Sequence, residues 1–406
     1  MRRIEVSGTK ALVAAVSFVA VLALAAGPAS AQTLRERLDG ALSVFPRAQT
    51  GAFAYDLHSG RTVYRLHSRR AFEPASNQKL SVAVAALDRL GPSYRITTSV
   101  RSAGSQSGSV WQGRLFLKGH GDPSLSRRDV RRLARAIRDR GIRRVTGRIM
   151  ADESYFDRLR TGPGWDPSWY RVESPPLSAL VVARGRVDGR TVARPWRAAA
   201  VAFRKALRSV GVAVPRGVRV GKAPGTSHAL ARTRSAPLTR LVRTMNKVSD
   251  NFYAEMLLKH LGKKVRGAGT TRAGAVVVRT TLDRRGIPLR GVRIADGSGL
   301  SPYNRLTARA IGVLLISAWR DASIRAPLVD SLPIAGVDGT LADRMRRGAA
   351  RGRVRAKTGT TFAASALSGY VGGRYVFSIL QNGRPVNYTR ARRSQNRFAQ
   401  VLARAL

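Results

Sequence analysis

The chain has 406 residues, and 44% of them are hydrophobic, so it is long enough for about two ordinary domains and apolar enough to form a packed core. It contains no cysteine, which excludes disulfides, thiol catalysis and thiolate metal sites. The formal net charge of +50 at pH 7 predicts attraction to polyanions.

The N-terminus has the features of a secretory leader. Basic residues precede the uncharged apolar run Ala11–Ala26, and the small residues Ala29-Ser30-Ala31 follow it. This order predicts a signal peptide over residues 1–31, cleaved after Ala31, with an uncleaved membrane anchor as the alternative. The mature chain is therefore expected outside the cytoplasm, in the cell wall, in the periplasm or in the medium.

Export bears on the meaning of the positive charge. Nucleic acid is not expected as a partner there, whereas anionic wall polymers and the phospholipid membrane surface are. Only ten of the 73 basic residues are lysine, and arginine is spread along the whole chain. This distribution favours a general bias of composition over a dedicated binding stripe, and both interpretations stay open.

The predicted elements of the mature chain begin with a short amphipathic helix, Leu34–Leu42. A β-hairpin follows at Gly51–Leu66, where apolar and polar residues alternate around a turn at Ser59-Gly60. A second helix is expected at Leu80–Leu90, and Gly91-Pro92 ends it.

Residues 98–224 differ in character and predict an inserted, β-rich subdomain. They combine short strands, one basic amphipathic helix and many Gly, Pro and Trp residues. The strands are expected at Ser109–Lys118 and Val145–Ala151, and the helix at Arg127–Arg140.

Residues 225–406 return to helices and then to strands, with Leu238–Leu261 as the clearest helical stretch. Helices that flank an antiparallel sheet make an α+β fold, so residues 32–97 and 225–406 are expected to form one discontinuous domain. Three strands, the last two joined by a turn of two glycines, and a closing helix are predicted at Arg353–Thr360, Ala366–Val371, Tyr375–Gln381 and Phe398–Leu406.

The first motif with chemical meaning is Ser76-Asn77-Gln78-Lys79, at the start of the second predicted helix. Residues three apart share a helix face, so Lys79 can reach the Ser76 hydroxyl. A serine hydroxyl needs a neighbouring base to act as a nucleophile, and a lysine can serve where burial and nearby positive charge lower its pKa. An ordinary N-cap serine is the alternative for Ser76.

The second motif, Ser249-Asp250-Asn251, lies beside the helical stretch Phe252–Leu261. The Ser249 hydroxyl is suited to relay a proton toward a leaving group, and the Asn251 amide is suited to hold the substrate backbone and Lys79. A capping turn before the helix is the alternative.

The third motif, Lys357-Thr358-Gly359-Thr360, ends a predicted strand. A strand edge can pair with an extended peptide, and Gly359 would let that peptide approach the backbone closely. Lys357 adds a charge, and Thr358 and Thr360 add hydroxyls, suited to a terminal carboxylate. A surface turn with a solvated lysine is the alternative.

The joint occurrence of the three motifs decides between these alternatives. Each falls on the element that its role requires: a helix start, a loop beside a helix, and a strand. The set Ser-x-x-Lys, Ser-x-Asn and Lys-Thr-Gly is typical of β-lactamases and penicillin-binding proteins and predicts catalysis through an acyl-serine. The five histidines form no His-Glu-x-x-His pattern, and neither metal nor cofactor is expected.

Further segments extend this pattern over most of the mature chain: Glu73–Leu80, Gly119–Leu125, Asp152–Asp157, Asp296–Ser301, Asn304–Thr307 and Leu332–Leu341. Together they resemble the class C low-molecular-mass penicillin-binding proteins, the D-alanyl-D-alanine carboxypeptidase/endopeptidase family. The resemblance implies the α+β transpeptidase fold shared with serine β-lactamases. The interval from Ser76 to Ser249 is shorter than in the best-known members, which implies that one of two usual inserted domains is missing or reduced.

The resemblance also implies an activity: cleavage of peptidoglycan stem peptides that end in D-Ala-D-Ala, with covalent inhibition by β-lactams. Ser76 would form the acyl-enzyme with Lys79 as base, and Ser249 and Asn251 would assist. The sequence leaves open whether carboxypeptidase or endopeptidase cleavage dominates.

The resemblance assigns substrate contacts as well. Lys357 and Thr358 would bind the terminal carboxylate, and the backbone N–H groups of Ser76 and Thr360 would form the oxyanion hole. Asp152 would recognise the free amino group of a diaminopimelate-type side chain, with a turn aspartate as the alternative. Three other functions stay open: a β-lactamase, an esterase of the same fold, and an inactive basic protein that binds the wall.

Overall fold

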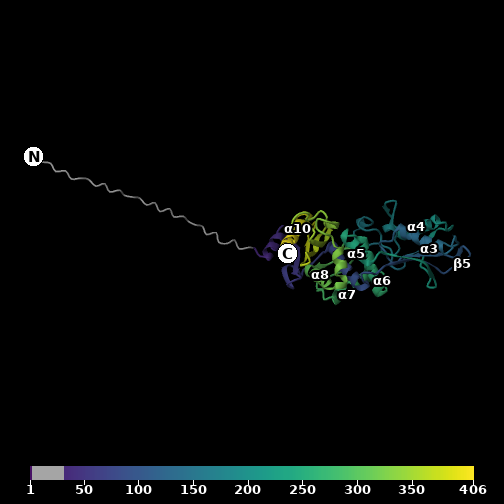
Figure 1. Cartoon of the computed structure of the whole chain (residues 1–406), viewed down its shortest axis with the longest axis horizontal. Helices are drawn as coiled ribbons and strands as arrows, with labels where there is room; N and C mark the ends of the chain where they lie inside the picture. The colour runs from purple at the N-terminus through teal and green to yellow at the C-terminus, as the bar shows by residue number, and fades with distance from the viewer. Residues whose placement is uncertain (2–31) are drawn as a thin grey trace. The chain divides into compact units, whose positions relative to one another are not determined.

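The computed structural model describes Met1 and residues 32–406 of the chain (Figure 1). The signal peptide predicted at residues 1–31 therefore falls, apart from Met1, outside the described residues. Residues Leu34–Leu406 form one unit. Within residues 32–406, no helix is both long and apolar enough to cross a bilayer.

One antiparallel sheet joins the two ends of this unit. Its strand order is β15-β16-β17-β1-β2, so the first two strands of the chain pair with the last three. Every residue of β16 is buried because both faces of the sheet are covered. The strands are β1 (Thr50–Asp56), β2 (Arg61–Leu66), β15 (Val354–Thr361), β16 (Ala364–Val371) and β17 (Tyr375–Asn382).

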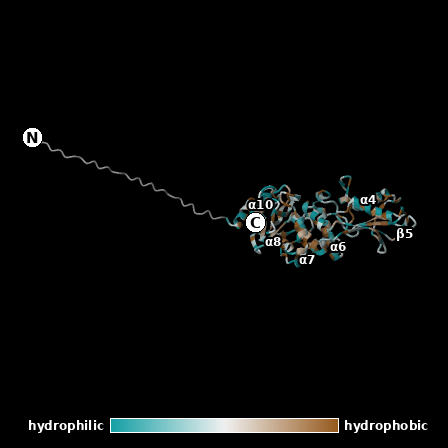
Figure 2. Cartoon of the chain, viewed as in Figure 1, coloured by the Kyte–Doolittle hydropathy of each residue, from teal (hydrophilic) through white to brown (hydrophobic). Residues whose placement is uncertain are grey.

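Helices cover both faces of this sheet. On one face, α1 (Leu34–Leu42) and α10 (Tyr388–Arg404) pack through Leu38 and Phe398 against Phe377 of β17. A layer of helices covers the other face of the sheet, and the hydrophobic residues of this layer gather around α6 and α7 (Figure 2). That layer holds α2 (Gln78–Leu90), α5 (Leu238–Lys247), α6 (Asn251–Arg266), α7 (Thr271–Arg284), α8 (Ala308–Arg320) and α9 (Ala322–Ser331).

Helix α2 lies at the centre of this layer and positions the Ser-x-x-Lys motif. It contacts α5, α6, α7, α8 and α9. All residues from Gln78 to Leu87 are buried, so the helix is covered on every side. A helix in such surroundings needs no polar face, which agrees with its many alanine and valine residues. The observed helices and antiparallel sheet agree with the predicted α+β fold.

A second sheet, with a hydrophobic core of its own, is built from the middle of the chain. Helices α3 (Arg127–Asp139) and α4 (Pro195–Ser209) pack in that core. The sheet has the order β12-β9-β7-β4-β13, with β12 (Val218–Val220), β9 (Ile149–Asp152), β7 (Leu115–Lys118), β4 (Thr97–Ser102) and β13 (His228–Arg234). We propose that these elements form the inserted subdomain, whose sheet then reaches ten residues past the predicted end at residue 224.

Short elements complete the described chain. Three small sheets pair β5 (Ser105–Ser107), β6 (Val110–Gln112) and β8 (Arg144–Val145); β10 (Arg186–Val187) and β11 (Arg190–Thr191); and β3 (Ala71–Phe72) and β14 (Leu306–Thr307). Five 3₁₀ helices lie at η1 (Arg47–Gln49), η2 (Ala75–Asn77), η3 (Pro167–Trp169), η4 (Ala183–Gly185) and η5 (Gly339–Leu341).

Four predicted elements differ from the structure. The strand predicted at Val145–Ala151 divides into β8 and β9, which belong to different sheets. The stretch Leu238–Leu261 is two helices, because Ser249 adopts a φ of 57° and Asp250 caps α6 through the backbone N–H of Tyr253. The strand predicted at Ser109–Lys118 divides into β6 and β7 around Gly113, whose φ is 133°. The closing helix begins at Tyr388, ten residues before the predicted Phe398.

Candidate active site

The Ser-x-x-Lys motif places a lysine amine against a serine hydroxyl. Ser76 lies in η2 just before α2, and Lys79 follows in the first turn of α2. The Nζ atom of Lys79 lies 2.8 Å from Oγ of Ser76. It also donates to Oδ1 of Asn251 at 2.8 Å and to the backbone carbonyl of Ser298 at 2.6 Å. Three partners thus fix the amine beside the hydroxyl.

The turn that presents Ser76 has an uncommon backbone. Ala75 adopts a φ of 45°, in the left-handed region that non-glycine residues rarely occupy. Gly299, itself at a φ of 87°, packs against this turn so closely that a Cβ there would lie 1.9 Å from the Ala75 carbonyl oxygen. The segment around Gly299 therefore supports the strained turn from behind.

The second and third motifs meet each other through a second lysine. The Nζ atom of Lys357 lies 2.8 Å from Oγ of Ser249 and donates to the carbonyl of Thr358 at 2.8 Å. Ser249 lies between α5 and α6 with its backbone in the left-handed region. Lys357 is fully buried in β15. Asn251, the first residue of α6, links this pair to Lys79.

Strand β15 presents part of its backbone at a free sheet edge. The N–H of Ala356 donates to the Pro333 carbonyl, away from β16. Backbone groups of an antiparallel strand alternate in direction, so those of Thr358 and Thr360 also point away from β16. Within residues 32–406, the bridge of Ile334 to Arg355 is the last pairing along this edge. An extended peptide can therefore pair with β15 beyond it.

Gly359 packs against the turn that carries Ser76, and its predicted role toward the substrate stays a prediction. A Cβ at this position would lie 3.0 Å from the Pro74 carbonyl oxygen and 3.1 Å from the Ala75 Cβ. Next to it, the Asn77 amide donates to the Lys357 carbonyl at 3.1 Å. The absence of a side chain thus lets β15 pack against the turn that carries Ser76.

Burial makes the amine beside the serine easier to deprotonate than that of an ordinary lysine. Burial lowers the pKa of Lys79 to about 8, against the opposing effect of the Asp296 and Glu255 carboxyl groups. The pKa of Lys357 is lowered well below its usual value, first by burial and then by the charge of Lys79. The positive charges of Lys79 and Lys357 repel each other in this buried site, so one of the two ammonium groups loses its proton more readily than an isolated lysine would.

Two buried carboxyl groups behind the lysine were not assigned a role from the sequence. Oε1 of Glu255 accepts from the N–H groups of Gly297 at 3.0 Å and Ser298 at 2.7 Å. This contact orients the Ser298 carbonyl toward Lys79. Burial raises the pKa of Glu255 to about 8. The sequence does contain one indication of a role for Glu255. It lies four residues after Asn251, one helical turn along α6, and therefore on the same face of that helix.

Asp296 organises the loop that follows. Its carboxylate accepts from the N–H groups of Gly299 at 2.8 Å and Ser301 at 2.7 Å, and from the Asn304 amide at 2.7 Å. It also accepts from the indole N–H of Trp165 at 2.8 Å. The segments 296–301 and 304–307, quoted above only for their resemblance, therefore form the rigid support of Lys79 and Ser76.

The middle of the chain also reaches the site. The Asn251 amide donates to the Glu173 carbonyl at 3.0 Å. Arg184 pairs with Asp250, the residue between the two functional side chains of the second motif. Trp165 contacts Asp296, as noted, so residues 165–184 meet the second motif at two points and the supporting loop at a third. This region can therefore line the approach to the serine.

The family is decided by the match of its model to nearly the whole described chain. The model of the D-Ala-D-Ala carboxypeptidase 3 (S13) family matches residues 34–194 and 187–405. The chain belongs to this family. It is therefore a serine-type peptidase, a hydrolase, as the three motifs predicted.

Individual relatives agree with this assignment. The chain is 33% identical to the D-alanyl-D-alanine carboxypeptidase of Actinomadura sp. (strain R39), over 86% of this chain and 81% of the relative. It is 34% identical to carboxypeptidase DacB of Mycolicibacterium smegmatis, over 80% of this chain and 75% of the relative. The predicted resemblance to the carboxypeptidase/endopeptidase family is confirmed.

Solved structures share the fold. The crystal structure of penicillin-binding protein 4 (dacB) from Haemophilus influenzae superposes with a TM-score of 0.80 at 21% identity and covers 91% of this chain and 98% of its own. A predatory peptidoglycan endopeptidase from Bdellovibrio bacteriovorus gives a TM-score of 0.54 at 20% identity, covering 82% of this chain and 86% of its own. The predicted fold class is confirmed.

Asp152 is a candidate residue of the middle region, and its carboxylate lies 3.5 Å from the ammonium group of Lys118. Asp152 ends β9 with a fully buried side chain. Its carboxylate accepts from the N–H of Ser154 at 2.9 Å, the hydroxyl of Ser154 at 2.6 Å and the N–H of Ala223 at 2.9 Å. None of these contacts joins it to the other candidate residues. Recognition of a free amino group by Asp152 stays a prediction, and we propose that its carboxylate also fixes the loop after β9.

The contact between Gly299 and the nucleophile turn yields a first prediction. We expect Gly299→Ala to slow penicillin acylation by about tenfold or more, because the new Cβ must displace the Ala75 carbonyl and with it the Ser76 hydroxyl. The rate is measured with a fluorescent penicillin. Gly267→Ala is the matched control, because Gly267 has a φ of 71° in the left-handed region but open space around its Cβ position.

Both variants place alanine in the left-handed region, which costs about 1 kcal/mol of stability. Only the variant at Gly299 should lose acylation. Equal acylation rates in the two variants would show that the loop does not support the nucleophile turn.

Proposed function

We propose that this S13 protein is an exported D-Ala-D-Ala carboxypeptidase that cleaves peptidoglycan stem peptides through an acyl-enzyme on Ser76. The observation that carries the assignment of residues is the buried amine of Lys79 at 2.8 Å from the Ser76 hydroxyl. Endopeptidase cleavage is chemically the same step on a longer leaving group, so the same site serves both.

Substrate binding is proposed at the free edge of β15. The peptide pairs with the backbone of Thr358 and Thr360, and its terminal carboxylate approaches Lys357 and the hydroxyl of Thr358. This alignment brings the carbonyl of the penultimate D-alanine to Ser76. The N–H groups of Ser76 and Thr360 face the same carbonyl oxygen in the proposed oxyanion hole.

Acylation follows as a balanced sequence of proton transfers. The neutral amine of Lys79 takes the proton from Ser76, and Oγ attacks the carbonyl carbon of the penultimate D-alanine. The tetrahedral intermediate collapses as the C–N bond breaks. The leaving D-alanine amine takes up a proton that Lys79 supplies through the Ser249 hydroxyl, with Asn251 holding the amine of Lys79.

Deacylation repeats the chemistry with water. Lys79, neutral again, removes a proton from a water molecule that attacks the acyl carbon. The Ser76 ester bond breaks, and Oγ recovers its proton from the lysine. A β-lactam enters the same way, but its leaving group stays attached to the acyl moiety. Slow deacylation then gives a long-lived adduct.

The proposal is tested by incubating the mature protein with a fluorescent penicillin and measuring the intact mass. We expect one adduct per chain, on the peptide that carries Ser76, and release of D-alanine from a stem peptide ending in D-Ala-D-Ala. Rapid hydrolysis of the drug without an adduct would instead indicate a β-lactamase. Cleavage of simple esters alone would indicate an esterase, and no reaction at all a binding protein.

A second prediction concerns Lys357. We expect Lys357→Met to lower kcat/KM for a peptide ending in D-Ala-D-Ala by about 10- to 100-fold, the usual effect of a hydrogen bond to a charged group. The same peptide ending in D-alaninamide, which lacks the carboxylate, is the matched control and should lose far less. An equal loss for both peptides would remove Lys357 from carboxylate binding.

The net charge of +50 supports one further partner class. We propose that the exported protein associates with anionic components of the cell envelope, either wall polymers or the membrane surface.

A further inference from the structure

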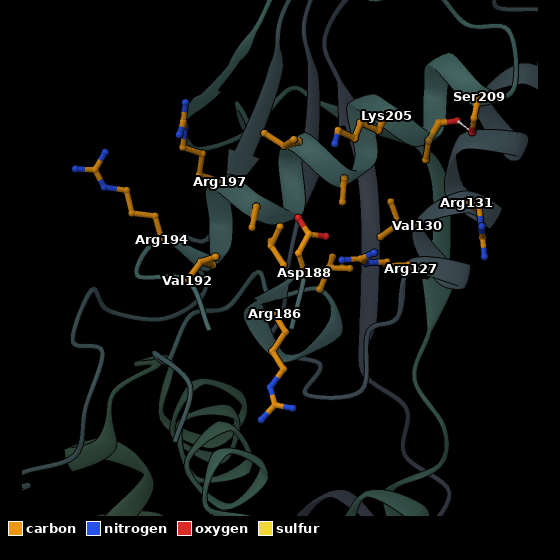
Figure 3. Close-up of a pocket in the computed structure, with 16 residues that line it drawn as sticks. Arg127, Val130, Arg131, Arg186, Asp188, Val192, Arg194, Arg197, Lys205 and Ser209 are labelled. Atoms are coloured by element: carbon orange, nitrogen blue, oxygen red, sulfur yellow. Dashed lines mark hydrogen bonds between the residues drawn. The ribbon is translucent and has the colours of Figure 1, made fainter. Parts of the chain in front are cut away.

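A hollow in the middle region of the chain lies outside the serine site. It is about 500 Å³ in volume and lies between α3, the length of α4 and the hairpin of β10 and β11 (Figure 3). This size lies within the range of pockets that hold small molecules. None of its lining residues belongs to the three catalytic motifs.

The rim of this hollow is strongly cationic. Arg127 and Arg131 of α3 lie on one side of it, and Arg194 and Arg197 on the other (Figure 3). Six cationic side chains and one carboxylate, that of Asp188, line it, the cations being Arg127, Arg131, Arg186, Arg194, Arg197 and Lys205.

These cations are free of protein partners. All six residues are exposed, and within residues 32–406 none of their side chains makes a hydrogen bond or an ion pair. Arginines elsewhere in this region do pair, as Arg160 does with Glu153. Six unpaired positive charges around one concave surface create a potential that attracts an anion. Six exposed cations without a protein partner therefore share this one concave surface.

The wall of the hollow is apolar, which distinguishes it from a simple cationic patch. Val130 and Val182 belong to the buried core and reach its lining, and Val201 lies on the facing side of α4. The hairpin adds Val187, whose side chain is exposed. An occupant that satisfies this surface carries both an anionic group for the rim and an apolar group for the wall.

We propose that this hollow binds the head group of an anionic phospholipid, with the phosphodiester on the arginine rim and the first acyl carbons on the valines. The inference deepens the proposed association with the anionic envelope and commits to the membrane surface. A phosphodiester wall polymer matches the rim but has no group for the apolar wall.

The proposal is tested by calorimetric titration of the mature protein with dihexanoyl phosphatidylglycerol below its micelle concentration. Glycerol phosphate, which has the anionic group alone, and dihexanoyl phosphatidylcholine, which has no net charge, are the two reference ligands. We expect saturable one-to-one binding of the phosphatidylglycerol and at least about tenfold weaker binding of either reference. Equal binding of glycerol phosphate would overturn the lipid assignment in favour of a phosphate polymer, and equal binding of the phosphatidylcholine would exclude a charge-selective site.

Variants locate the binding in the hollow. The triple variant Arg127→Ala, Arg131→Ala and Arg197→Ala should weaken binding by about tenfold or more, and Val187→Ser by a smaller factor. The control removes the same charge from exposed positions of α10, by Arg390→Ala, Arg392→Ala and Arg393→Ala, and should bind as the unaltered protein does. Equal loss in both triple variants would reduce the effect to net charge and overturn the site.

Penicillin acylation is measured on the same preparations. We expect it to be unchanged in both triple variants, which also verifies that they fold. Loss of lipid binding with full acylation supports the site. Absence of lipid binding by the unaltered protein overturns the lipid proposal while acylation leaves the proposed enzyme function intact.

Discussion

Replacement of Ser76 by alanine is expected to abolish both the penicillin adduct and the release of D-alanine. The substitution removes Oγ, the only protein atom that bonds to the acyl group in the proposed mechanism, so the proposal requires complete loss of both reactions. The fold should survive, because Lys79 keeps its contacts to Asn251 and to the Ser298 carbonyl. The measurement is intact mass after incubation with penicillin, together with the thermal unfolding midpoint.

Ser107→Ala is the matched control for this variant. Ser107 is an exposed serine of β5 and should lose neither activity nor stability. Persistent labelling of the Ser76→Ala protein would refute the assignment. If the label then mapped to Ser249, the two serines of the site would have exchanged the roles proposed for them.

Local patterns were sufficient to predict the elements that carry the site. Alternation predicted the hairpin of β1 and β2, and helical spacing predicted α2, because both are set by residues close together in the sequence. The three motifs were recognised for the same reason, since each is a short run of residues. The contacts between them, such as that of Lys357 with Ser249, connect segments far apart in the chain and appear only in the fold.

The supporting groups could not be predicted in this way. Glu255 acts through the backbone of Ser298, a partner that no sequence spacing specifies. The left-handed backbone of Ser249 interrupts a stretch whose composition is helical throughout, so tertiary packing overrides the local preference. The packing of Gly359 against Pro74 and Ala75 likewise joins segments far apart in the chain and could not be predicted from local spacing.

The second large effect is expected for Lys79. We expect Lys79→Met to slow acylation by about 10²- to 10⁴-fold, the usual contribution of a positioned general base. Methionine fills a similar volume but cannot accept the serine proton. Lys259→Met is the control for removal of a buried lysine, because Lys259 is equally buried but pairs with Asp157. That control should lose stability and keep its rate of acylation, measured as the second-order rate constant with a fluorescent penicillin.

The same base predicts the pH dependence of the unaltered enzyme. Burial lowers the pKa of Lys79 to about 8, and the amine is a base only when it is neutral, above that pKa. At pH 7.5 about a quarter of such an amine is neutral, against about one part in a thousand for an ordinary lysine. The acylation rate should therefore rise by about tenfold per pH unit below pH 8 and level off above it. A rate constant independent of pH between about 6 and 9 would mean that another group takes the proton from Ser76.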